Sequence, residues 1–461
     1  MTTDHAGTAD PAGAGHPPGT ADPAVSAAEV GAAVAQAHRQ EWAFVLAATA
    51  RVTRDLDAAE ECVQDAYVAA LDTWTRQGVP RNPGAWLTTA ARHRALDLLR
   101  RDRTLRSKLP LLVVPRASPD GPVPGASAGG GGGPVTDGAD VIGDDRLRLI
   151  FTCCHPALAR EAQVALTLRL VCGLSTAEIA QAFVVWEPTM AARVTRAKKK
   201  IMAARIAYRV PGAAELPDRL DAVLTVVHLL YTTGHTAPGG PGLVRPDLVD
   251  RALSLAHMVR ELMPDEREAA GLLALLLITD ARRAARTGPD GSLLLLEQQD
   301  RSLWDRAAIE RGSALVVESL RGGRPGRFAL QAAIAAVHGE APSYTATDWP
   351  QLLVLYDRLL RAWPSPVVSL NRAVVVSMVS GPVAALEEIG SLEQDGRLDG
   401  YRYLPATKAD LLRRLGRDAE ALNAYRAALD RTQNAAEREF LARRMAEVSG
   451  REETELPGRT G

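Results

Sequence analysis

The chain has 461 residues, enough for about three domains, and its formal net charge of −1 argues against a uniformly basic nucleic-acid binder. No apolar run approaches the about 20 residues of a membrane span, and the four cysteines lack both a signal peptide and a secretory spacing. We therefore expect a soluble, cytoplasmic protein with buried thiols. A metal or redox role for Cys153, Cys154 and His155 is the alternative, although no second ligand pair follows at a suitable spacing.

Residues 1–32 lack apolar periodicity and predict a disordered N-terminal tail. Residues 33–105 have the periodicity of a helical domain. Its first helix begins around Trp42, Val45 and Leu46. The second helix has an apolar stripe formed by Ala59, Val63, Ala66, Tyr67 and Leu71.

Charge is segregated along this domain. Five acids lie between Asp55 and Asp65, at a helix N-terminus, where the helix dipole favours them. After a loop at 78–84, a third helix is predicted from Ala85 to Arg101, and the segment from Arg76 to Pro119 holds ten Lys or Arg against two Asp. Such blocks indicate separate surfaces for separate partners, with a polyanion at the basic one.

Residues 106–143 predict a flexible linker rich in glycine and proline, with five consecutive glycines at 129–133. A tether of about 30 such residues spans roughly 30 Å in root-mean-square terms, enough to let the modules on either side bind separate sites. The alternative is a connector with no role beyond its length.

Residues 144–207 predict a helix-turn-helix. Ser175 and Glu178 have the spacing of a capping box, and Pro188 suits the first turn of the next helix. One face of that helix is apolar, and 188–214 holds seven Lys or Arg and no acid. The apolar face consists of Met190, Val194, Ala197 and Ile201. Taken alone, this pattern also fits an amphipathic hairpin with a solvated basic face.

Residues 208–450 predict a helical extension in which 272–278 is buried nearly all round. Weak repeats of the tetratricopeptide (TPR) type occur near 350–445, where Gly381 lies thirty-five residues before Gly416 in a similar context. An irregular helical bundle is the alternative. Residues 451–461 predict a disordered tail.

Two stretches carry a family resemblance. RVTRDLDAAEECVQDAYVAALDTW and AWLTTAARHRALDLLRRDR resemble domain two of an extracytoplasmic-function (group IV) sigma factor. GLSTAEIAQAF and PTMAARVTRAKKKI are similar to domain four, and LRLIFTCCHPAL with the helical tail resembles the subgroup with a TPR-like C-terminal extension. The resemblance spans about residues 35 to 448. It implies an all-α protein that binds core RNA polymerase and promoter DNA, directs transcription initiation and needs no cofactor.

The resemblance also implies site residues. The core polymerase-binding candidates are Asp57, Glu60, Glu61, Gln64 and Asp65. The −10 candidates are Arg81, Asn82, Arg92, Arg94 and Arg100. The −35 candidates are Thr189, Ala192, Arg193, Arg196, Lys198, Lys199 and Lys200.

The sequence departs from relatives at two tryptophans. No aromatic residue lies in the −10 loop itself, and Trp86 at its border is expected in the core, so the residues of the base pocket stay open. Trp186 stands in the turn of the helix-turn-helix, where we expect it to staple the two helices together.

No catalytic motif occurs, and a metal role for His228 and His235 is disfavoured because Thr-Thr-Gly is expected to end their helix. Besides a sigma factor, two hypotheses remain: a stand-alone helix-turn-helix regulator with a protein-interaction or ligand-sensing domain, and an enzyme with a DNA-binding appendage. The C-terminal extension is expected to regulate or support activity through a regulatory protein or an intramolecular contact.

Overall fold

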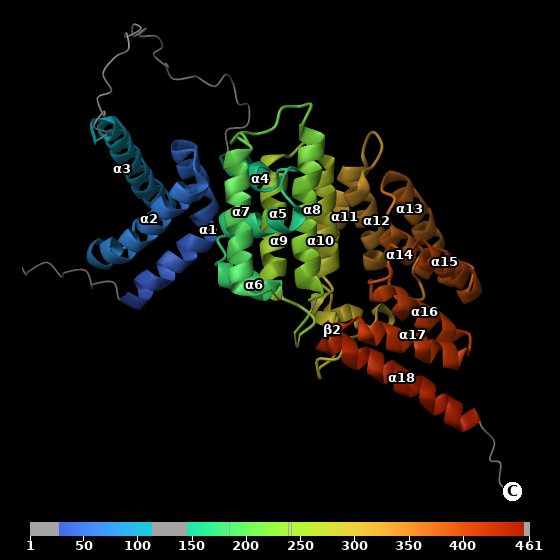
Figure 1. Ribbon diagram of the computed structural model, residues 1–461. Coiled ribbons are helices and arrows are strands. Elements are labelled where there is room, and N and C mark those ends of the chain that lie inside the picture. The colour runs from blue at the N-terminus through green and yellow to red at the C-terminus, as the bar shows by residue number, and fades with distance from the viewer. Residues whose placement is uncertain (1–26, 113–144, 184, 238, 241, 456–461) are drawn as a thin grey trace, which may run out of the picture. The chain divides into compact units, whose positions relative to one another are not determined.

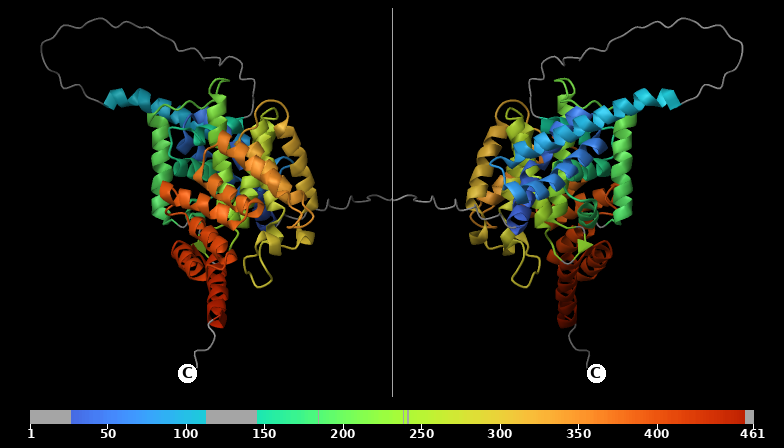
Figure 2. Two further views of the ribbon diagram at one scale, coloured as in Figure 1. Left: turned by 90° about the vertical axis from the view of Figure 1, so that its right-hand side faces the viewer. Right: turned by 90° about the vertical axis from the view of Figure 1, so that its left-hand side faces the viewer.

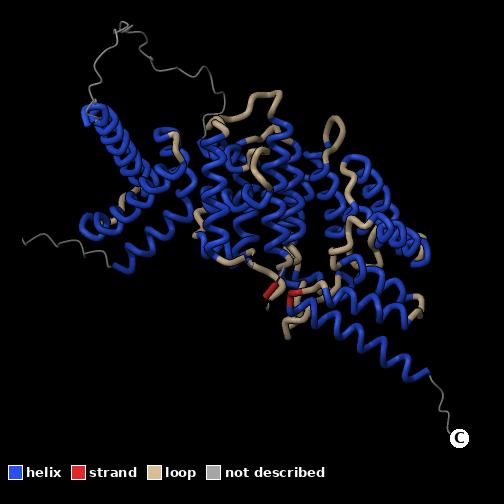
Figure 3. The backbone as a smooth tube through the Cα atoms, in the orientation of Figure 1, coloured by secondary structure: helices blue, strands red, loops and turns tan. Residues whose placement is uncertain are grey.

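The computed structural model describes residues 27–112, 145–183, 185–237, 239–240 and 242–455, and these are almost wholly helical (Figure 1, Figure 3). Within these ranges the strands are β1 (Gly239–Gly240) and β2 (Gln433–Asn434), which pair in parallel. The predicted all-α fold is confirmed. No helix in the described ranges has both the length and the apolar character that a membrane crossing requires.

The described helices belong to two compact units. The first unit holds α1 (Ala27–Thr53), α2 (Leu56–Gln77) from Ala58 onward, and α3 (Pro83–Leu112). The second unit holds every helix from α4 (Asp145–Cys153) onward. The predicted helix-turn-helix and the C-terminal extension therefore lie in one compact unit.

The first unit is built on the packing of α1 against α3. The backbone N–H of Asp57 donates to Asp55 Oδ1 at 2.8 Å, which caps α2, and Ala85 N–H donates to Asn82 Oδ1 at 3.0 Å, which caps α3. Two helices extend beyond the predicted bounds: α1 starts at Ala27, inside the stretch expected to be disordered, and α3 reaches Leu112, inside the expected linker.

The helix-turn-helix begins the second unit. It comprises α4, α5 (Arg160–Leu166), the π-helical turn η1 (Thr167–Val171), α6 (Thr176–Ala182) and α7 (Glu187–Ala203). The capping box of α6 is present: Ser175 N–H donates to Glu178 Oε2 at 2.7 Å, and Glu178 N–H donates to Ser175 Oγ at 3.2 Å.

Helix α8 (Leu216–His235) joins the helix-turn-helix to the C-terminal extension and packs against α4 and α5. Arg219 donates to the backbone carbonyl of Phe151 at 2.5 Å, and its guanidinium lies 5.9 Å from the centroid of the Phe151 ring. The Thr-Thr-Gly stretch does not end the helix, contrary to the prediction, because α8 continues to His235.

The next four helices include α10, which packs against the other three and is buried on nearly every side, as predicted for 272–278. They are α9 (Pro246–Leu262), α10 (Arg267–Asp280), α11 (Arg306–Leu320) and α12 (Arg327–Glu340). Between α10 and α11 lie the short 3-10 turns η2 (Arg283–Ala285), η3 (Leu296–Gln298) and η4 (Arg301–Leu303).

The last six helices form successive hairpins in which each helix packs on its neighbour in sequence. They are α13 (Trp349–Ala362), α14 (Pro366–Val379), α15 (Pro382–Asp395), α16 (Tyr403–Arg414), α17 (Asp418–Asp430) and α18 (Ala435–Glu455). Gly381 and Gly416 both adopt positive φ, at +89° and +70°, where the chain turns between paired helices. In both views of Figure 2, α18 extends beyond its neighbours toward the C-terminus. Stacked hairpins agree with a repeat architecture, and the TPR-like assignment stays a prediction.

Candidate nucleic-acid and polymerase interfaces

Helix α7 has one face held by the second unit. Met190, Val194, Ala197 and Ile201 are all buried, which confirms the apolar stripe predicted from their spacing. Pro188 lies in the first turn, where its missing N–H breaks no helical hydrogen bond. The packing of α7 against α5 and α6 places the rest of its surface outward.

The outward face of α7 is basic. Thr189, Ala192, Arg196, Lys199 and Lys200 are exposed, and Arg193 is half-buried. Among the residues that the structure describes, no carboxylate forms an ion pair with Arg193, Arg196, Lys199 or Lys200. These cations are therefore available to a polyanion.

Lys198 does not belong to this outward face, contrary to the prediction. Its side chain is buried, because position 198 follows Ala197 and lies one turn after Val194, at the border of the apolar stripe. Its charge acts on the thiol of Cys153 in α4. Counting basic residues along a helix does not distinguish the border of the stripe from the exposed face.

Trp186 is the N-cap of α7 and does not staple the two helices together, contrary to the prediction. The residue is 75% exposed, the highest value among the large apolar side chains of the described chain. Its extended backbone (φ −62°, ψ 133°) directs the chain out of the preceding turn before the helix begins. An exposed indole thus stands at the end of α7 from which the outward face starts.

Helix α2 presents a mixed acidic and apolar face. Glu61, Gln64 and Asp65 are exposed, as is Asp57 in the first turn. Val68 and Leu71 continue the same side of the helix and are 66% and 46% exposed. Val68 was not predicted to lie on this surface, and the prediction that Leu71 belongs to the buried stripe is wrong, because the stripe runs instead through Ala70 to Trp74.

Glu60 also differs from the prediction, because it is buried whereas Glu61 is exposed. Position 60 lies one turn before the buried Val63 and two turns before the buried Tyr67, so it faces the interior of the first unit. Its Oε1 accepts a hydrogen bond from Gln64 Nε2 at 3.4 Å.

The basic residues at α3 are exposed as predicted. Arg81, Asn82, Arg92, Arg94 and Arg100 all lie on the surface. Asn82 has a structural task as well, since its side-chain oxygen caps α3. Arg94 lies 3.4 Å from Asp65 and Arg100 lies 3.2 Å from Asp97, in exposed ion pairs that stabilise little and can exchange for phosphate.

Trp74 and Trp86 pack on each other at the start of α3. Their ring centroids are 5.6 Å apart at an interplanar angle of 71°, and Trp74 is buried. Trp86 is half-buried by this edge-to-face contact, so its expected core role is confirmed in part.

Comparison with protein families identifies these modules. Residues 39–104 match the family model "Sigma-70 region 2", and residues 148–201 match "Sigma-70, region 4". The chain belongs to the sigma-70 family, as an extracytoplasmic-function-like sigma factor with a C-terminal extension. A sigma factor directs transcription initiation, and a stand-alone helix-turn-helix regulator is not favoured because region 2 is present as well.

Other comparisons concern the extension. Residues 219–320 of the sigma factor match "Family of unknown function (DUF6596)". "Uncharacterized protein R00370" of Rhizobium meliloti (strain 1021) is 41% identical over 396 residues, covering 86% of this chain and 91% of that protein. No solved structure matches the chain. The similarity thus continues through the extension, whose family model carries no assigned activity.

The cysteines of the sigma factor are free, buried thiols. All four are buried, and Cys154 Sγ lies 3.4 Å from Thr167 Oγ1. Burial raises the pKa of Cys154 to about 11 and that of Cys172 to about 12, so both are neutral thiols at pH 7. Within the described residues, no three His, Cys, Asp or Glu side chains are grouped so as to hold a metal ion.

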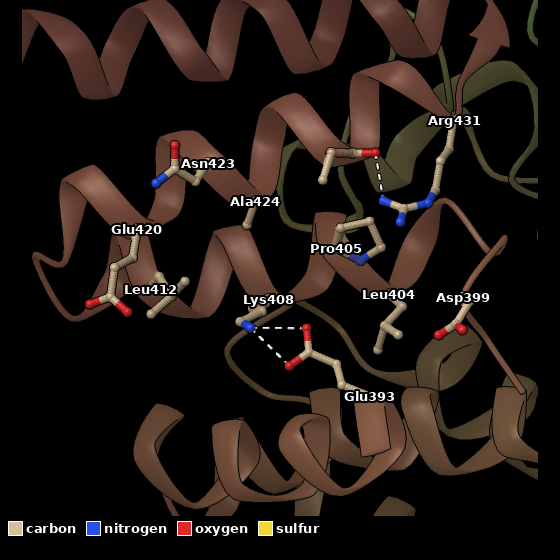
Figure 4. A pocket seen from close by; sticks show the side chains of 11 residues that line it. Glu393, Asp399, Leu404, Pro405, Lys408, Leu412, Glu420, Asn423, Ala424 and Arg431 are labelled. Atoms are coloured by element: carbon tan, nitrogen blue, oxygen red, sulfur yellow. Dashed lines mark hydrogen bonds and ion pairs between the residues drawn. The ribbon is translucent and has the colours of Figure 1, made fainter. Parts of the chain in front are cut away.

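Two cavities lie on the hairpins of the extension. The first is an open groove of about 490 Å³ in which Lys408 and Glu393 point toward each other at 2.8 Å (Figure 4). The second, of about 290 Å³, is bordered by Arg402, Tyr403 and Glu437. Arg402 and the Tyr403 hydroxyl donate to Glu437 at 2.9 and 2.5 Å. In both cavities these charges are matched by partners within the chain.

Proposed function

We propose that this sigma factor recognises the −35 element of its promoters through the outward face of α7. The observation that carries the proposal is the pairing of a buried apolar stripe with exposed cations that lack carboxylate partners in the described chain. Thr189, Ala192, Arg193 and Arg196 are the candidates for base edges, and Lys199 and Lys200 for phosphates. Lys198 is not a candidate for DNA contact, because its side chain is buried.

The first unit provides the other two contacts in this proposal. One surface of α2 contacts core RNA polymerase. Its polar residues orient the two proteins, and its exposed apolar residues add buried area that raises affinity. The polar residues are Glu61, Gln64 and Asp65, and the apolar residues are Val68 and Leu71. Arg81, Arg92, Arg94 and Arg100 approach the phosphates of the −10 element. Asn82 contributes the amide N–H₂ that its cap leaves free.

The C-terminal extension, in this proposal, supports the helix-turn-helix and does not mask it. The outward face of α7 is exposed although α8 to α18 belong to the same compact unit. Arg219 and Tyr208 connect the extension to α4, the latter through a 3.4 Å hydrogen bond from its hydroxyl to the Asp145 carbonyl. An intramolecular contact is therefore favoured over dependence on a separate regulatory protein.

The test is transcription in vitro by reconstituted holoenzyme. We expect Arg193→Ala with Arg196→Ala to cut −35-dependent initiation, at about 1–3 kcal/mol per lost base contact, with binding to core polymerase unchanged. Arg311→Ala with Arg361→Ala, which removes two exposed arginines of the extension, is the charge-matched control and should behave as wild type. Equal loss of core binding in the α7 variant would contradict the assignment.

The same assay tests the extension. Truncation after residue 210 removes the α8 surface that covers α4 and α5, so we expect activity to fall. A gain of activity would instead identify the extension as an inhibitor.

A further inference from the structure

Three arginines gather around Trp304 in the interior of the C-terminal extension. The guanidinium of Arg301 lies 4.2 Å from the centroid of the Trp304 ring, and that of Arg282 lies 5.7 Å from the same centroid. Arg286 follows one turn after Arg282, and its charge acts on Arg282. The guanidinium of the exposed Arg306 lies 5.8 Å from the same centroid, so three guanidiniums lie around one indole and Arg286 lies near Arg282. We call the less exposed Arg282, Arg286 and Arg301 the arginine cluster.

No carboxylate neutralises the arginine cluster in the described chain. Arg301 donates to the backbone carbonyls of His338 and Ala341 at 3.0 and 2.7 Å, and Arg286 donates to the His235 carbonyl and to Thr236 Oγ1. The guanidinium of Arg282 has neither a hydrogen bond nor an ion pair with any described residue. Burial, then the charge of Arg286, lowers the pKa of Arg282 to about 10, so it stays charged at pH 7.

The neighbouring Arg283 shows the contrast. Its guanidinium pairs with Asp280 at 2.8 Å and with Asp250 at 2.9 Å. The Glu437 carboxylate, whose charge reaches Arg286, is already occupied by Arg402 and Tyr403. The carboxylates near the arginine cluster are therefore paired with residues outside it, and the cluster retains a net positive charge.

Further hydrogen-bond donors lie unused around the cluster. Trp304 is 3% exposed and Tyr231 2% exposed, yet neither the indole N–H nor the phenol O–H has a partner in the described chain, and the same holds for Nη2 of Arg301. A buried polar group without a partner destabilises the fold, because it has lost its hydrogen bonds to water and gained none in return. Several such donors beside unneutralised cations require an acceptor from outside the chain.

The two histidines of this region do not add charge. Burial, then the adjacent arginines, lowers the pKa of His235 to about 2 and that of His338 to about 4, so both imidazoles are neutral at pH 7. Tyr231 stacks on His235 at 5.3 Å, at the end of α8. The surroundings of the cluster thus offer donors and neutral rings and no competing anion.

We propose that the arginine cluster binds a small phosphate-type oxyanion, with Trp304 Nε1 and the Tyr231 hydroxyl as neutral donors. A tetrahedral oxyanion offers four oxygens to forked guanidinium donors, which suits this set better than chloride or the two oxygens of a carboxylate. The anion would link four segments of the extension. These are the end of α8, the segment that follows α10, the turn η4, and the end of α12. The anion therefore stabilises the part of the extension on which the helix-turn-helix packs.

The test uses purified full-length protein and inorganic phosphate as the probe. Thermal unfolding is followed while phosphate is titrated against chloride and acetate at matched ionic strength. We expect a saturable rise of Tm with phosphate and a smaller, unsaturated effect of the other two salts. An equal response to all three salts would mean a general salt effect and would overturn the proposal.

Two variants and a control locate the site. Arg282→Met should weaken the apparent phosphate affinity at least tenfold and should not lower Tm without phosphate, because it removes an unneutralised buried cation. Tyr231→Phe, which removes one hydroxyl, should weaken the apparent phosphate affinity several-fold. This variant tests the site if Arg282→Met fails to fold. Arg311→Met, at an exposed arginine of α11, should keep the wild-type response. Wild-type phosphate affinity in Tyr231→Phe and in folded Arg282→Met would overturn the assignment.

Discussion

Adjacent glutamates on α2 lie in opposite environments. Glu60 faces the interior of the first unit and is buried, whereas Glu61 is exposed beside Gln64 and Asp65. Because successive helical residues are rotated by about 100°, a run of acids cannot lie entirely on one docking surface. The two glutamates therefore have separable roles, one in stability and one in binding.

We predict that Glu61→Lys weakens binding to core polymerase and changes the free energy of unfolding by no more than about 0.5 kcal/mol. Glu60→Lys should instead cost about 1–3 kcal/mol of stability, because it places a longer cation at a buried position. Urea unfolding and a core-binding titration measure the two effects. Unchanged core affinity for Glu61→Lys would show that its face is merely solvated.

At the scale of elements, glycine lets the helices of the extension approach closely. A Cβ on Gly271 of α10 would lie 2.6 Å from the backbone nitrogen of Ala329 in α12. A Cβ on Gly312 of α11 would lie 2.4 Å from Cγ1 of Ile278 in α10. The backbone of α12 cannot move away from an added Cβ as a flexible side chain can. The α10–α12 contact therefore depends more on Gly271 than the α10–α11 contact depends on Gly312.

We predict that Gly271→Ala destabilises the second unit by about 1–3 kcal/mol through overpacking. Gly390→Ala is the matched control, since it lies inside α15 with no atom within 4 Å of an added Cβ. That control should gain about 0.5–1 kcal/mol from the better helix propensity of alanine. Chemical denaturation of the full chain measures both, and equal effects would contradict the close-packing argument.

At the scale of the whole molecule, the second unit holds three half-buried histidines that are neutral at pH 7. Burial, then nearby arginines, lowers the pKa of His228 and of His338 to about 4 and that of His235 to about 2. His228 lies edge-on to Phe328 at 5.6 Å, with Arg327 adding positive charge. All three therefore bind a proton more readily in the unfolded chain, where histidine has a pKa of about 6.5.

We predict that the second unit loses stability as the pH falls from 7 to 4. In this window the histidines bind protons in the unfolded state and stay neutral in the folded state. The free energy of unfolding therefore falls by up to about 1.4 kcal/mol per pH unit for each histidine. His228→Leu should reduce the slope by about a third of that combined contribution, and His257→Gln, at an exposed position of α9, is the control. Unfolding at fixed pH values measures the slope, and a wild-type slope in His228→Leu would refute the assignment.

The sequence by itself determined the helical elements and the family. The capping box at Ser175 and Glu178 and the buried stripe from Met190 to Ile201 follow from local spacing, which a helix obeys in any tertiary context. The same holds for the acids of α2 and the basic residues of α3. Helix α8 ran past its expected end at Thr-Thr-Gly because tertiary packing overrode weak propensity.

Only the tertiary structure decided which side chains are available. Lys198 and Glu60 looked like surface charges and are buried, while Leu71 and Trp186 looked like packing residues and are exposed. The arginine cluster around Trp304 brings together residues from separate segments of the chain, so no local sequence pattern predicts it. Spacing fixes which residues share a helix face, and burial depends on what packs against that face, which is a property of the whole fold.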